Sequence, residues 1–64
     1  MTGNQKAALT RAINRFERAV DDKAFQGTIP RYESCETQSA WDAIDDEYRM
    51  ARGALMACFD RYCA

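Results

Sequence analysis

Residues 39–63 read SAWDAIDDEYRMARGALMACFDRYC, and their apolar side chains recur at alternating steps of three and four. The positions that follow this alternation are Trp41, Ile44, Tyr48, Ala51, Leu55, Cys58 and Tyr62. Residues spaced in this way share one face of an α-helix. The stretch therefore predicts a long amphipathic helix over residues 39–63, which needs a second surface to cover its apolar face.

A second apolar stripe lies upstream, in a segment without proline or glycine between residues 4 and 25. Its members are Leu9, Ile13, Phe16, Val20 and Ala24, at steps of four, three, four and four. This spacing predicts a helix over residues 4–25. The side chain of Thr2 or Asn4 is expected to accept from the first free backbone N–H groups, and Gly27 to provide a left-handed residue at the end.

The segment that separates the two stripes, residues 26–38, predicts a loop. Pro30 fixes its own backbone and pushes Ile29 toward an extended conformation. Two amphipathic helices joined by such a connection fold back on each other, because neither can hide its stripe from water alone. The expected fold is an all-α, antiparallel helical hairpin that forms one domain over residues 1–64.

Three hydroxyl residues are candidates for the start of the second helix: Ser34, Thr37 and Ser39. We place the start at Ser39, because Asp42 follows it by three residues, as in a capping box. Acidic residues also gather in the next turns, where the helix dipole favours them: Asp42, Asp45, Asp46 and Glu47. The two upstream hydroxyls remain alternative starts.

The composition predicts a thin core that needs help from a partner. The chain has 64 residues and a formal charge of −1, and 47% of its residues are hydrophobic. Eleven of these are alanine, and only nine positions are Leu, Ile, Val or Phe. At this size the gain from burial and the loss of chain entropy nearly cancel. We therefore expect the hairpin to form a homodimer, with four helices in one bundle.

The second helix is more apolar near its end than one partner helix can cover. Met56, Phe59 and Cys63 widen its apolar arc to about 160°, and Met50 adds to the opposite shoulder. Such a surplus predicts either a dimer interface or a patch that binds another protein. Arg31 and Tyr32 lie in a loop longer than a hairpin needs, and we expect them to contact a partner as well.

Three arginines form a stripe on the first helix. Arg11, Arg15 and Arg18 lie about 140–200° from Ile13 around the helix, opposite the expected core. A guanidinium fork suits phosphate or carboxylate groups, so the stripe is a candidate anion-binding face. The alternative, an ordinary solvated helix side, is favoured by the pI of about 5.2 and by nearby acidic residues.

Catalytic and metal chemistry are not expected. The chain has no histidine to act as a base or ligand, and its three cysteines, Cys35, Cys58 and Cys63, cannot all pair with one another. We expect reduced thiols, no cofactor, no metal and no enzymatic activity. No apolar run approaches eighteen residues and the chain starts with polar residues, which predicts a cytoplasmic protein without a membrane span or a secretory signal.

Two family resemblances bear on function. Met1-Thr2, Lys6, Ala8-Leu9 and Ala12 resemble the start of the Rop-like plasmid proteins, which implies a dimer of hairpins that binds RNA. The runs Lys23–Gly27 and Glu47–Leu55 resemble small helical-hairpin proteins encoded by bacteriophages. This second resemblance implies a non-enzymatic role, in which the protein binds and often inhibits a host protein or sequesters a nucleotide signal.

These observations predict a self-associating helical protein that binds another macromolecule. A protein partner is the first expectation. The alternative is RNA or an anionic nucleotide, held by the arginine stripe. The two differ in whether the apolar residues near Phe59 or the arginines of the first helix contact the partner.

Overall fold

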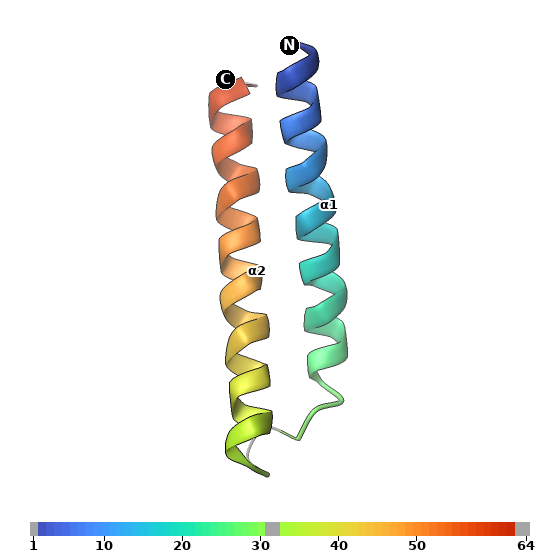
Figure 1. Cartoon of the computed structure of the whole chain (residues 1–64), viewed down its shortest axis with the longest axis vertical. Coiled ribbons are helices and arrows are strands. Elements are labelled where there is room, and N and C mark those ends of the chain that lie inside the picture. Colours follow the sequence, from blue (N-terminus) through green and yellow to red (C-terminus); the bar gives the residue numbers. More distant parts are fainter. Residues whose placement is uncertain (1, 31–32, 63–64) are drawn as a thin grey trace.

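The computed structural model describes residues 2–30 and 33–62, which form two long α-helices joined by a loop. Helix α1 spans Gly3–Gln26 and helix α2 spans Cys35–Tyr62. The helices run antiparallel and side by side, so that the start of α1 and the end of α2 lie together, away from the loop (Figure 1). Between Cα atoms the molecule measures 48 × 15 × 14 Å. The all-α helical hairpin expected from the sequence is confirmed.

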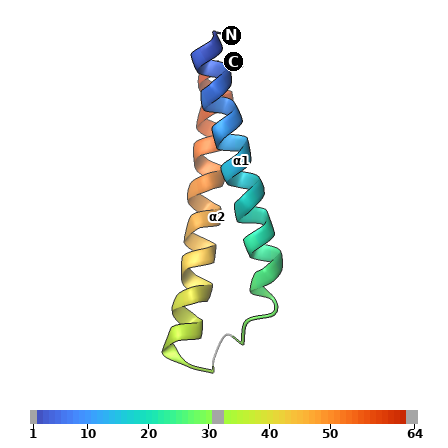
Figure 2. The same cartoon turned by 45° about the vertical axis from the view of Figure 1, so that its right-hand side comes forward.

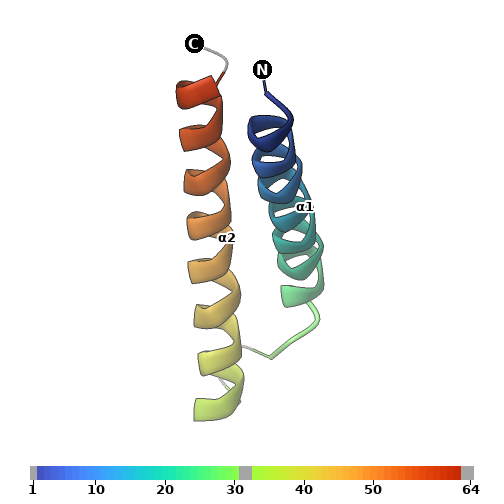
Figure 3. The same cartoon turned by 45° about the horizontal axis from the view of Figure 1, so that its top comes forward.

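The two helices are adjacent along the rod but not strictly parallel to each other. They lie side by side in Figure 1 and in Figure 3, where the chain-end side of the rod comes forward. Figure 2 shows that they overlap near the chain ends and separate toward the loop. This inclination is the ordinary consequence of packing the side-chain ridges of one helix into the grooves of another.

Helix α1 begins with a capping box. The Thr2 hydroxyl accepts from the backbone N–H of Gln5 at 3.2 Å, and the Gln5 side-chain oxygen accepts from the backbone N–H of Thr2 at 3.0 Å. Two N–H groups that lack helical partners are satisfied in this way. Of the two candidate caps in the sequence, the structure therefore selects Thr2.

The end of α1 differs from the expectation for Gly27. That residue has φ −62° and ψ −16°, which is right-handed, so the predicted left-handed stop is wrong. The helix closes instead through a tighter turn, in which Thr28 and Ile29 donate backbone hydrogen bonds to the carbonyls of Phe25 and Gln26 at 2.9 and 3.0 Å. These bonds satisfy the last carbonyls of the helix, so no left-handed residue is needed.

Helix α2 begins at Cys35, four residues before the predicted start at Ser39. The cause is the upstream hydroxyl pair. Ser34 Oγ accepts from the backbone N–H of Thr37 at 3.2 Å, while Thr37 Oγ1 accepts from the backbone N–H of Ser34 at 3.1 Å. This reciprocal cap satisfies the first donors of the helix one turn early. The loop is correspondingly shorter than predicted.

The contact line on α2 follows the predicted three-four alternation. Ala51 is completely buried at its centre. The other six members of the stripe are half-buried: Trp41, Ile44, Tyr48, Leu55, Cys58 and Tyr62. The face of α2 that meets α1 is therefore the one that the sequence indicated.

The contact line on α1 is rotated away from the predicted one. Ala12, Ala19 and Gln26 are buried, whereas Ile13 and Val20 remain 36% and 42% exposed. The observed line runs through Leu9, Ala12, Phe16, Ala19, Lys23 and Gln26, at steps of three and four that match α2. Alanine allows two helices to approach closely, and a line that keeps the same period as its partner stays in contact over the full length.

A polar cluster joins the helices near the loop. Gln26 is only 3% exposed, and its Nε2 donates to the Trp41 carbonyl and to Asp45 Oδ1, both at 3.0 Å. Lys23 Nζ donates to the same Asp45 oxygen at 2.8 Å, and Trp41 Nε1 donates to the Ile29 carbonyl at 2.8 Å. We call these residues the loop-end cluster. A buried polar group of this kind fixes the register of two helices, because a shifted register leaves it without partners.

Candidate interaction surfaces

Two long flanks lie on either side of the line where α1 meets α2. On α1, Ile13 is about 200° from Arg11 around the helix, so these side chains belong to opposite flanks. On α2, the Glu47 carboxylate accepts a hydrogen bond from Arg15 and therefore lies on the same flank as Arg15. Met56 lies nine residues from Glu47, which is about 180° around the helix. We call the two sides the arginine flank and the apolar flank.

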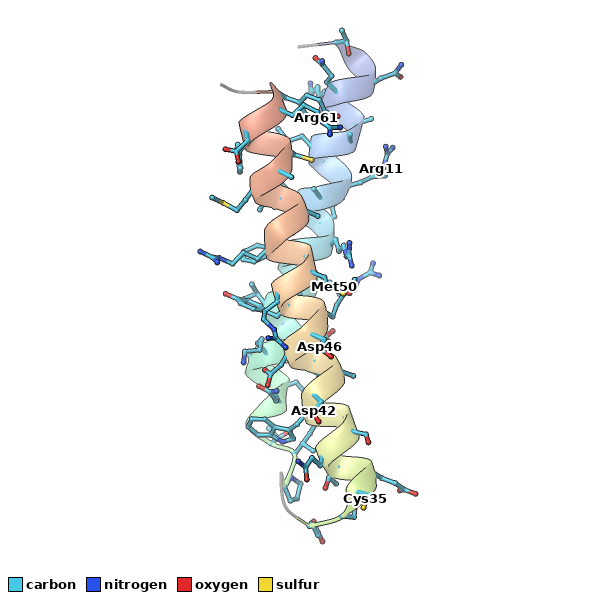
Figure 4. All side chains as sticks on the ribbon, turned by 90° about the vertical axis from the view of Figure 1, so that its left-hand side faces the viewer. Arg11, Cys35, Asp42, Asp46, Met50 and Arg61 are labelled. Carbon is cyan, nitrogen blue, oxygen red and sulfur yellow. The ribbon has the colours of Figure 1, made fainter. Side chains whose placement is uncertain are left out.

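The arginine flank holds a shallow groove of about 410 Å³. The residues that line it are Arg11, Asn14, Arg15, Arg18, Ala19, Asp22 and Glu47. All three arginines of the predicted stripe are thus brought into one groove. Figure 4 shows Arg11 and Met50 on the same side of the hairpin, so Met50 borders this flank. The groove is net positive, because three guanidinium groups face two carboxylates.

Within the groove, Arg15 is already bound to α2. Its Nε donates to Glu47 Oε1 at 2.6 Å and its Nη2 to Glu47 Oε2 at 3.1 Å. This bidentate hydrogen bond lowers the pKa of Glu47 and raises that of Arg15. The pair therefore stabilises the hairpin above the ordinary glutamate pKa, and this contribution is lost as the pH falls through the lowered value. Since both side chains are exposed to solvent, the contribution is small.

The other two arginines of the groove face solvent. Arg11 and Arg18 are exposed, and within residues 2–30 and 33–62 neither forms an ion pair. They lie seven residues apart, which is about 10.5 Å along the helix, with Asn14 between them. Each is available to an external anion, whereas Arg15 must first leave Glu47.

The apolar flank carries four large exposed side chains, two from each helix: Ile13, Val20, Met56 and Phe59. Their exposed fractions run from 36% to 50%. The arginine flank holds the other two large exposed apolar residues of the described ranges, Phe25 and Met50, at 63% and 62%. Met56 and Phe59 of the predicted interface therefore lie together near the chain ends, and Ile13 and Val20 lie on the same flank further toward the loop. Met50 is separated from Met56 and Phe59, because it lies on the arginine flank.

Three acidic residues of α2 bind other side chains. Asp45 accepts from Lys23 and Gln26, Asp46 pairs with Arg49, and Glu47 pairs with Arg15. In the described part of the chain, no three His, Cys, Asp or Glu side chains come together in a way that would hold a metal ion. Asp45 and Glu47 thus form cross-helix ion pairs, and Asp46 forms a local one.

The remaining predicted residues fall in two groups. Cys35, exposed at the first position of α2, and Cys58, half-buried, are both free thiols. Arg31, Tyr32 and Cys63 lie outside the described residues. Neither α1 nor α2, over the ranges that the structure describes, is long and apolar enough to cross a membrane.

Comparison with protein families, with curated proteins and with solved structures finds no match to this chain. The resemblances to Rop-like and phage-encoded hairpins therefore stay predictions from the sequence. Arguments about function rest on the two flanks themselves.

Proposed function

We propose that this protein is a non-enzymatic helical interaction module, which self-associates and binds another protein. The observation that carries the proposal is the contrast between a core of small residues and a flank of large ones. The buried positions of the described chain are three alanines and one glutamine, whereas six large apolar side chains are exposed. Within these described residues the hairpin thus fully buries only small residues and one glutamine, and leaves six large apolar side chains exposed to water.

The energetics of the hairpin favour association. Full burial of one large aliphatic or aromatic side chain contributes roughly 1.5–3 kcal/mol, and no large side chain of the described residues is fully buried. Two helices with such a core are marginally stable alone. A partner that binds only the folded hairpin stabilises it by mass action. One form of this function is the binding of a host protein, as the resemblance to phage-encoded hairpins implies.

The absence of histidine from the whole chain supports the non-enzymatic part of the proposal. A cysteine nucleophile normally relies on an adjacent base, most often histidine. Cys35 is exposed, at the start of α2, and Cys58 sits in the contact line between the helices. These positions favour the interpretation that Cys35 is a surface thiol and that Cys58 is a packing residue.

Self-association is tested by sedimentation equilibrium of the full chain at micromolar concentrations. We expect a mass of about twice 7.3 kDa, and a melting temperature that rises with protein concentration, because only the folded state associates. Circular dichroism at several concentrations measures the second quantity. A monomer whose melting temperature is independent of concentration would refute the proposal.

The groove of the arginine flank favours a second candidate function, the binding of RNA or an anionic nucleotide. Arg11 and Arg18 face solvent beside Asn14, and Arg15 adds a third guanidinium once it leaves Glu47. Arginine binds phosphate oxygens through two parallel hydrogen bonds. The presence of Asp22 and Glu47 in the same groove weakens the attraction, which is why we place this function second.

This candidate is tested by the fluorescence anisotropy of a labelled RNA stem-loop in a salt series. If the groove binds phosphates, Arg11→Gln with Arg18→Gln should weaken binding at least tenfold and flatten its salt dependence. Glu47→Gln should strengthen binding, because it releases Arg15. Arg52→Gln, on the apolar flank, is the matched control and should have little effect. Equal affinity of the double variant and the control would exclude the groove.

A further inference from the structure

We propose that the occupant of the apolar flank is a second copy of this chain. The inference rests on the proposed self-association and assigns it to one surface. Ile13 and Val20 of α1 and Met56 and Phe59 of α2 lie on this side of the hairpin, so both helices contribute to the patch. A surface built from both helices exists only in the folded hairpin, and its occupant therefore stabilises the fold.

The size of the flank fits a dimer of two such hairpins. The rod is 48 Å long and 15 Å wide between Cα atoms, so one side offers roughly 700 Å². A stable protein interface of standard size buries about 800 Å² on each partner. Side chains extend beyond the Cα envelope, so the accessible area of one flank exceeds the projected value. Contact along the full length of one flank is therefore comparable to an interface of standard size.

The charges of the flank also permit contact between two copies. In a two-fold contact each copy presents the same surface, so a flank of one sign would repel itself. The apolar flank carries both signs, with Lys6 and Arg52 against Glu17 and Asp45. The arginine flank instead places three arginines against two acids in its groove. The charges thus balance on the apolar flank, whereas self-contact through the other flank would bring together two grooves that each have one excess positive charge.

The exposed fractions agree with this assignment. The four apolar residues of the flank are between one third and one half exposed, so their inner parts already pack on the hairpin and their outer parts remain to be covered. Phe25 and Met50, on the other flank, are 63% and 62% exposed and so project further into solvent. They serve as matched control positions for substitution.

The test compares two double variants of the full chain by sedimentation equilibrium. Ile13→Lys with Val20→Lys adds charge to the apolar flank, and Phe25→Lys with Met50→Lys adds the same charge to the arginine flank. We expect the first to raise the dimer dissociation constant at least tenfold and the second to change it less than threefold. Buried unpaired charges weaken an interface strongly, whereas exposed ones do not.

A charge-swap mixture keeps the test valid if the first variant fails to fold alone. A chain with Ile13→Glu and Val20→Glu, mixed with the lysine variant, should recover the helical signal and the dimer mass, because opposite charges then meet across the contact. Failure of the mixture to associate would overturn the inference.

The remaining outcomes separate this inference from the proposed function. If the unmodified chain dimerises but the arginine-flank variant is the one that dissociates, or both behave alike, the assignment of the surface is wrong and self-association stands. If the unmodified chain is monomeric, both the proposed function and this inference fail.

Discussion

Ala51→Asp is expected to unfold the hairpin at neutral pH. Ala51 is completely buried at the centre of the contact line, against α1. A carboxylate there would lose its hydration without gaining a cation, which costs more than about 3 kcal/mol. Small domains have only about 5–15 kcal/mol of stability, and this core is thinner than most. Circular dichroism at 222 nm should show most of the helical signal lost at 25 °C.

The matched control is Ala57→Asp. Ala57 lies on the same helix but is exposed, so the substitution changes helix propensity by about 0.7 kcal/mol or less and buries no charge. Its melting temperature should stay within a few degrees of that of the unmodified chain. If the two variants melt together, Ala51 does not lie on the contact line and the packing described above is incorrect.

Gln26→Glu is expected to destabilise the hairpin by about 2–3 kcal/mol. The amide of Gln26 donates to the Trp41 carbonyl and to Asp45 Oδ1. A carboxylate of the same shape has no proton to donate, so it would place negative charge against two acceptors in a buried position. Thermal melts at pH 7 measure the loss.

The dependence of this effect on pH distinguishes charge repulsion from a packing fault. Repulsion raises the pKa of the introduced carboxyl above its unfolded value, so the destabilisation is present at neutral pH and shrinks as the pH falls toward about 4. Gln38→Glu makes the same chemical change at an exposed position near the start of α2, and there a negative charge is tolerated. A difference from the unmodified chain that stays constant with pH would indicate a packing fault.

The sequence predicted the contact face of α2 well because most residues of its apolar stripe have large side chains. Trp41, Ile44, Tyr48 and Leu55 belong, with Ala51, to an unbroken three-four alternation, and the structure places all of them on the contact face. The start of the helix was misplaced by four residues. Ser34, Thr37 and Ser39 all have the chemistry of a cap, and the choice among them depends on hydrogen bonds that only the folded loop shows.

The contact line on α1 was misplaced because several residues that lie on it are only weakly hydrophobic or polar, so a search for apolar periodicity does not find them. Ala12, Ala19, Lys23 and Gln26 carry little hydrophobicity, whereas Ile13 and Val20 stand out in any apolar pattern. One signal in the sequence would have found the correct line. The true positions keep the same three-four alternation as α2, while the predicted stripe contains two successive steps of four, from Phe16 to Val20 and on to Ala24.

The candidate surfaces were predictable only in part. The sequence placed Arg11, Arg15 and Arg18 on one exposed side of α1, and the structure brings them into one groove. It did not predict that Glu47 would bind Arg15, because these residues are 32 positions apart in the chain and their contact depends on the register of the two helices. The rotation of α1 about its axis, which buries Ala12 and Ala19, brings Ile13 and Val20 to the flank that carries Met56 and Phe59.

The sequence separations of the hydrogen bonds described above predict the order in which the hairpin opens. Trp41 bonds to Ile29 across 12 residues, Gln26 to Trp41 across 15, and Arg15 to Glu47 across 32. Contacts that close short loops form at the lowest entropic cost, so folding proceeds by zipping from the loop toward the chain ends. Amide protons near the chain ends should accordingly exchange with solvent fastest, and those beside the loop-end cluster slowest.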